Sequence, residues 1–112
     1  MGNGIDHPEV VDLVAEGADG SYRLIVVETG RWDGSAEQLL KFQSKLNHYL
    51  TYVFDGQMHR EHPESEGRPV VLELDYFEPL DAVTEEFIRK ARDIMSGKAV
   101  AFEVKRLPRD EP

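Results

Sequence analysis

Nine residues, 30–38, constrain the fold of this 112-residue chain more than any other segment. A β-branched apolar run stops just before them, the only tryptophan is Trp32, and a turn-prone Asp-Gly-Ser sequence follows it. Ser35 and Gln38 have the spacing of a capping box, in which each side chain bonds the other residue's free backbone N–H. Asp33 is an alternative cap. The segment therefore predicts an abrupt change from strand to helix.

The predicted helix after Ser35 has one apolar side. At about 100° per residue, its apolar side chains form a single stripe that contains Leu39, Phe42, Leu46, Tyr49, Leu50 and Val53. Lys41, Lys45 and His48 are assigned to the opposite, polar side. We expect this helix to pack by its stripe and to end near Asp55.

Four segments predict strands: 10–16, 22–28, 69–76 and 99–106. The first two form a hairpin. A second helix between the last two strands begins at Asp81 and ends near Gly97. Its predicted apolar stripe contains Val83, Phe87, Ala91, Ile94 and Met95.

This order, β-β-α-β-α-β, predicts an α+β fold. We expect a two-layer sandwich, in which a mixed sheet of about four strands carries two helices on one face. The chain length suits one domain. We assign it to residues 9–106, with a disordered N-terminus at 1–8 and a disordered tail at 107–112.

The net charge of −9 disfavours nucleic acid and anionic membranes as partners, since both repel an acidic protein. The chain has no cysteine, so disulfides and thiolate chemistry are excluded. It also lacks a run of about 20 apolar residues, and we expect a cytoplasmic protein. No phosphate loop, dinucleotide fingerprint or nucleophile elbow is present, and we predict no cofactor and no catalytic residue.

The motif Arg31-Trp32-Asp33-Gly34-Ser35, followed by Leu46-Asn47-His48-Tyr49-Leu50 and Asp55-Gly56-Gln57, resembles a family of small uncharacterised bacterial proteins classed as a domain of unknown function. The similarity spans nearly the whole chain. The resemblance implies a bacterial, cytoplasmic single domain. It implies no activity, cofactor or catalytic residue.

Trp32 and Asp33 have two interpretations. They could place an indole and a carboxylate at the mouth of a binding cleft, beside the N–H groups of a helix start. The structural interpretation is that Trp32 packs on the core edge while Asp33 or Ser35 caps the helix. We favour the structural one and expect Trp32 to be mostly buried.

His59 and His62 form the only cluster that resembles a metal site. Two histidines three apart can share one face of a helix, but zinc catalysis needs at least three protein ligands. We therefore predict no metal site here. A small-molecule or metal-dependent hydrolase-like site around Trp32, Asp33, His59 and His62 remains the alternative function.

The sheet face without helices is the candidate interaction surface. We assign to it Asp12, Arg23, Ile25, Val27, Glu73, Asp75, Glu103 and Lys105. The second strand is apolar on both sides, so it is either central or covered by another chain. The three carboxylates on the later strands could act as acid and base, but on an open face we expect nearly normal pKa values.

These observations favour a non-enzymatic protein-interaction module. The expected partner is a basic protein, because an apolar centre rimmed by acidic side chains selects one, or a second copy in a homodimer. An inhibitor or immunity-like protein that neutralises a basic toxin is a specialised form of this function.

Overall fold

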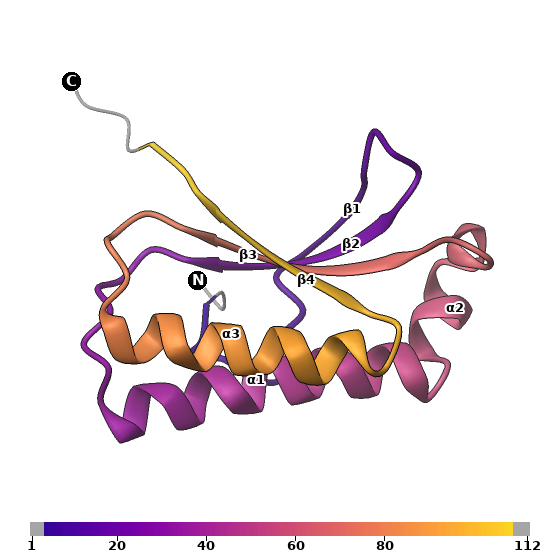
Figure 1. Ribbon diagram of the computed structural model, residues 1–112. Coiled ribbons are helices and arrows are strands. Elements are labelled where there is room, and N and C mark those ends of the chain that lie inside the picture. Colours follow the sequence, from indigo (N-terminus) through magenta and orange to yellow (C-terminus); the bar gives the residue numbers. More distant parts are fainter. Residues whose placement is uncertain (1–3, 109–112) are drawn as a thin grey trace.

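The computed structural model describes residues 4–108, which form a four-stranded mixed sheet with helices on one face (Figure 1). The strands are β1 (Leu13–Glu16), β2 (Tyr22–Glu28), β3 (Val70–Tyr76) and β4 (Ala101–Arg106), and they lie in chain order. β1 and β2 pair antiparallel, whereas the pairs β2–β3 and β3–β4 are parallel. The predicted α+β sandwich is confirmed.

Strand β2 is apolar on both sides because it is central. It lies between β1 and β3, and its side chains at Leu24 and Val26 are fully buried against the helices. Ile25 points to the opposite face and is only 7% exposed. Of the two explanations offered by the sequence, the central position is therefore correct.

Two long helices, α1 (Ala36–Phe54) and α3 (Ala82–Ser96), lie side by side under the same face of the sheet (Figure 1). Each begins at the predicted cap. Ser35 Oγ accepts a hydrogen bond from the Gln38 N–H (3.1 Å), and Asp81 Oδ2 accepts one from the Thr84 N–H (2.9 Å). A short helix α2 (Gln57–Glu61) and a 3-10 turn η1 (Pro63–Ser65) follow α1.

The capping box at the start of α1 is only half formed. The Gln38 side chain does not return to Ser35; its Oε1 accepts hydrogen bonds from the N–H groups of Asp33 (2.8 Å) and Gly34 (3.3 Å). Asp33 Oδ1 instead accepts from the Ser35 N–H (2.9 Å). Asp33 therefore stabilises the turn that precedes α1, and Ser35 is the residue that caps the helix.

The predicted apolar stripe of α3 is wrong in two positions. Thr84, Ile88 and Met95 are the buried residues of this helix, whereas Val83 and Ile94 are 53% and 62% exposed. The apolar arc of α3 is wider than its contact with the sheet and α1. Part of that arc therefore remains on the outer surface.

Lys45 and Asp12 form a fully buried ion pair, which corrects two predictions. Lys45 is not on the polar side of α1: its Nζ donates to Asp12 Oδ1 (2.6 Å) and to the carbonyls of His7 (2.8 Å) and Val10 (2.6 Å). Neither side chain of the pair has exposed surface. Asp12 is therefore not part of the open sheet face, because its carboxylate neutralises an ammonium inside the domain.

The segment that precedes β1 belongs to the folded domain. Ile5 is 3% exposed and packs in the core, and its N–H donates to Glu28 Oε1 (2.8 Å). The Gly4 N–H donates to Asp12 Oδ2 (2.9 Å). The domain boundary predicted at residue 9 is therefore too late. The disorder predicted for 1–3 and 109–112 falls outside the described residues.

No helix within residues 4–108 combines the length and the apolar character that crossing a membrane requires.

Candidate functional site

A network of charged side chains crosses the sheet face opposite the helices. Arg23 on β2 donates from Nη1 to Glu73 Oε1 on β3 (2.8 Å) and to Glu103 Oε1 on β4 (2.9 Å). Side chains alternate along each strand, so residues that pair in register share a face. Seven of the eight predicted surface residues lie there: Arg23, Ile25, Val27, Glu73, Asp75, Glu103 and Lys105.

This face differs from the predicted apolar centre with an acidic rim. Ile25 has little surface left to bury at 7% exposure, and the Arg23 and Glu73 side chains are only 18% and 10% exposed. The charges are also close to balanced, since Arg23 and Lys105 oppose three carboxyl groups. The charged groups of the sheet face are therefore largely paired with one another, and little apolar surface is left there for a partner to bury.

The pKa values of Glu73 and Asp75 are shifted in opposite directions from those of hydrated carboxyl groups. Burial first, then hydrogen bonding and charge repulsion from Glu73, raise the pKa of Asp75 to about 7. The hydrogen bond with Asp75 in turn lowers the pKa of Glu73, and Arg23 adds to this effect. Within the described residues, no group donates to the buried Oδ1 of Asp75. The expectation of nearly normal pKa values on this face is therefore wrong for Asp75.

Asp75→Asn should stabilise the protein at high pH. The carboxyl titrates at about pH 7 when folded, against an ordinary pKa of 3.8, so folding is favoured by protonation and loses stability as pH rises from about 4 to above 7. Asparagine mimics the protonated form. With allowance for partial exposure, we expect a gain of about 1 kcal/mol at pH 8 that vanishes near pH 4. Urea denaturation at both pH values measures it, and a loss of stability at pH 8 would contradict it.

Trp32 and Asp33, the two residues of the predicted cleft, lie in different places: Trp32 is buried, and Asp33 is on the surface. Trp32 is 7% exposed and packs on Phe42, with ring centroids 5.5 Å apart, as the structural interpretation predicted. Asp33 lines a mainly polar hollow of about 230 Å³, together with Arg31 and Lys41. The indole does not line this hollow. The two residues therefore do not form one binding site.

His59 and His62 bind local partners. His59 Nδ1 lies 2.9 Å from Ser65 Oγ, and His62 Nδ1 lies 3.4 Å from Glu64 Oε2. Within residues 4–108, no group of three His, Asp or Glu side chains could hold a metal ion.

The alternative hydrolase-like site is not assembled by this fold. Trp32 precedes α1 and the two histidines follow it, and the 19 residues of this helix span about 28 Å (Figure 1). A site that contains Trp32, His59 and His62 together is therefore contradicted by the geometry.

The outer surface of the helix layer carries an apolar groove between α1 and α3. A hollow of about 230 Å³ lies between the two helices, and one of about 470 Å³ continues it toward the end of α1. Asn47 and Leu50 line both hollows. The first is lined by Gln43, Leu46, Asn47, Leu50, Phe87, Lys90, Ala91, Ile94 and Met95.

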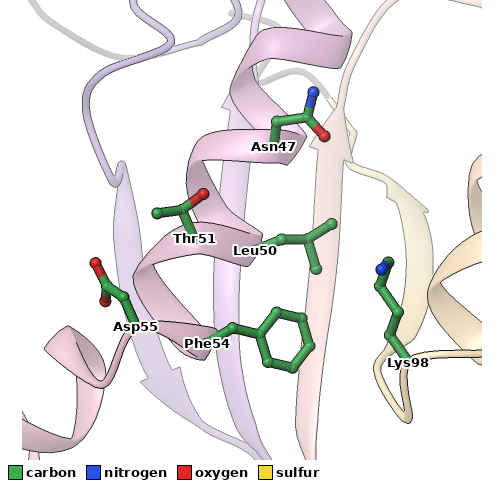
Figure 2. A pocket seen from close by; sticks show the side chains of 6 residues that line it. All are labelled: Asn47, Leu50, Thr51, Phe54, Asp55 and Lys98. Atoms are coloured by element: carbon green, nitrogen blue, oxygen red, sulfur yellow. The ribbon is translucent and has the colours of Figure 1, made fainter.

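Figure 2 shows the second hollow from close by. Leu50 and Phe54 point from α1 toward Lys98, and Thr51 and Asp55 line the edge of the hollow on α1. Phe54 is 56% exposed. Lys98 forms no ion pair with any residue of the described chain. The groove therefore combines exposed apolar side chains with an unpaired ammonium.

The groove was not predicted from the sequence, because one buried stripe was expected on each helix. Exposed apolar residues recur on both helices, at Leu40 and Phe54 on α1 and at Val83 and Ile94 on α3. A signal was available: the apolar arc of α3 holds Val83, Ile88 and Ile94, which is wider than one packing contact needs. A second apolar side on a surface helix indicates a second contact.

Sequence and structure comparisons give a family and no activity. No curated protein and no solved structure matches the chain significantly. A family model described as a family of unknown function, DUF6572, matches residues 3–107, which is nearly the whole chain. The predicted membership of an uncharacterised family is thus confirmed. The chain belongs to the family of unknown function DUF6572.

Proposed function

We propose that the protein is a non-enzymatic interaction module that binds another protein chain in the groove between α1 and α3. One observation carries the proposal: Ile94 and Phe54, at 62% and 56% exposure, stand beside a continuous apolar groove on one surface. Contiguous apolar surface of this kind, bordered by polar residues, is typical of protein-binding sites.

The groove is favoured over the sheet face by what each leaves exposed. On the sheet face, Arg23 already donates hydrogen bonds to Glu73 and Glu103, and the Ile25 side chain is buried. In the groove, burying Phe54 and Ile94 would remove apolar surface from water, which is the main driving force of association. A partner therefore gains more free energy in the groove.

A matched pair of variants tests which surface binds. Ile94→Glu places one carboxylate in the groove, and Leu13→Glu places one on the sheet face, where Leu13 is 47% exposed. Both sites are exposed, so both variants should fold. We expect partners captured from lysate of the native host to be retained by Leu13→Glu and reduced at least about tenfold by Ile94→Glu. Equal capture by both variants would contradict the proposal.

The sheet face is the second candidate surface. Its support is that no helix of the described chain covers it and that Glu103 and Lys105 are exposed there (Figure 1). A basic protein, such as a toxin held by an inhibitor or immunity-like protein, would be attracted by the net charge of −9. A homodimer could instead pair Lys105 with Glu103 across a two-fold axis. Loss of capture in Leu13→Glu alone would favour this surface.

A further inference from the structure

We infer that the groove between α1 and α3 takes an amphipathic helix whose apolar stripe is flanked by acidic side chains. The inference rests on the proposed function and adds the chemistry of the partner. It follows from the charge, the shape and the polar positions of the groove.

The groove is a positive site on an acidic protein. Lys90 is the only charged residue that lines the first hollow. Lys98 and Asp55 are the charged residues that line the second hollow, so the two hollows together carry two ammonium groups and one carboxylate (Figure 2). Lys90 has only a 4.0 Å pair with Glu86, at 73% side-chain exposure. An acidic segment meets a net positive charge here, whereas the chain as a whole has a net charge of −9 and repels it.

The shape of the groove suits a helix. On α1 the lining residues Gln43, Asn47, Leu50 and Phe54 follow one another at steps of four, three and four. This is the seam that a neighbouring helix packs into, and it extends over about 16 Å, or three turns. An extended strand would need unpaired backbone groups at a sheet edge, which two helix surfaces do not offer.

Two polar side chains lie in the middle of the apolar groove. Gln43 and Asn47 line it between the apolar positions and can hydrogen-bond to a partner. A buried polar residue on a helix seam fixes the register of the partner at some cost in affinity. The partner helix should therefore carry one polar residue within its apolar stripe.

A second copy of the chain fits the groove less well. A two-fold interface brings the same surface patch of both copies together. The two grooves would then bring together four ammonium groups, from Lys90 and Lys98 of each copy, and only the two carboxylates of Asp55. Like charges at such an interface oppose association.

The inference is tested by selection from a displayed library of helical peptides of about 14 residues, or about 21 Å. Leucines are fixed at three- and four-residue steps, and the flanking positions vary among Asp, Glu, Lys and Ser. The full chain is the bait, and Ile94→Glu is the counter-selection bait. Because Ile94 is 62% exposed, this variant should keep the parent's thermal midpoint, which is measured first. We expect the enriched peptides to be rich in Asp and Glu.

A selected peptide is then titrated against two variants of equal charge change. Lys98→Glu alters the groove and should weaken binding about fivefold or more, whereas Lys105→Glu on the sheet face should leave it unchanged. Enrichment of Lys-rich peptides, or equal binding to Ile94→Glu, would overturn the inference. Sedimentation could instead show a dimer that Ile94→Glu abolishes, while no acidic peptide is enriched. This result would overturn the inference but would still identify the groove as an interface. If the selection yields no peptide and sedimentation shows no dimer, the proposed function is overturned together with the inference.

Discussion

Lys45→Met should destabilise the protein by about 3–5 kcal/mol, because it leaves a buried carboxylate without its cation. Asp12 has no exposed side-chain surface and would keep only two donors, the N–H groups of Gly4 (2.9 Å) and Val27 (3.0 Å). The carbonyls of His7 and Val10 would also lose the hydrogen bond from Lys45, although that of His7 keeps the Val10 N–H (3.1 Å). Urea denaturation measures the change, which is a large part of the usual 5–15 kcal/mol total.

Lys41→Met is the matched control on the same helix. Lys41 pairs with Asp6 at 3.0 Å, but both side chains are exposed, at 44% and 68%. Its loss should change stability little, since exposed ion pairs contribute little. Asp12→Asn added to Lys45→Met should recover part of the loss by removing the unpaired charge. Equal effects of Lys45→Met and Lys41→Met would show that the buried pair does not stabilise the fold.

Trp32→Ala should cost about 3 kcal/mol, the usual loss for a buried large aromatic residue. Trp32 is 7% exposed at the entrance of α1 and contacts Phe42. Trp32→Phe is the control. Within the described residues the indole Nε1 has no hydrogen-bond partner, so phenylalanine loses packing area but no hydrogen bond and should cost less.

The tryptophan fluorescence of the protein reports the environment of Trp32, because it is the only tryptophan of the chain. We expect a blue-shifted emission maximum and weak quenching by iodide in the folded protein. An emission spectrum typical of a hydrated indole, together with an unchanged denaturation midpoint in Trp32→Ala, would contradict the structural role of Trp32.

The elements of this fold could be predicted because local signals agreed with the tertiary structure. Ser35 and Asp81 cap their helices as their spacing indicates, and the alternation of Leu72 and Leu74 places β3 correctly. The strand order required long-range pairing, which no local pattern encodes. The structure supplies it as β1-β2-β3-β4.

Lys45 was misplaced because its charge was given more weight than its position. It lies three residues after Phe42 and four before Tyr49, both fully buried, so the helix period puts it on the buried side. What makes this position tolerable for a lysine is the segment before β1, which brings Asp12 and two carbonyl groups over it. Nothing in the sequence of that segment predicts its path.

The candidate site was only partly predictable, for a related reason. Arg23, Glu73 and Glu103 were placed on one sheet face by their period of two, which the register confirms. The groove depends on the relative placement of α1 and α3, so Phe54 and Ile94 could not be brought together from separate helix patterns. The surplus apolar residues on each helix were the only sequence signal.

NMR chemical-shift mapping of the ¹⁵N-labelled chain shows whether a partner binds between α1 and α3. The labelled chain is titrated with the captured partner or the selected peptide. We expect the largest backbone shift changes at residues 47–54 and 90–98, which contain most of the residues that line the groove, and little change along β4. Large changes at Glu103 and Lys105 with none on the two helices would contradict it and place the partner on the sheet face.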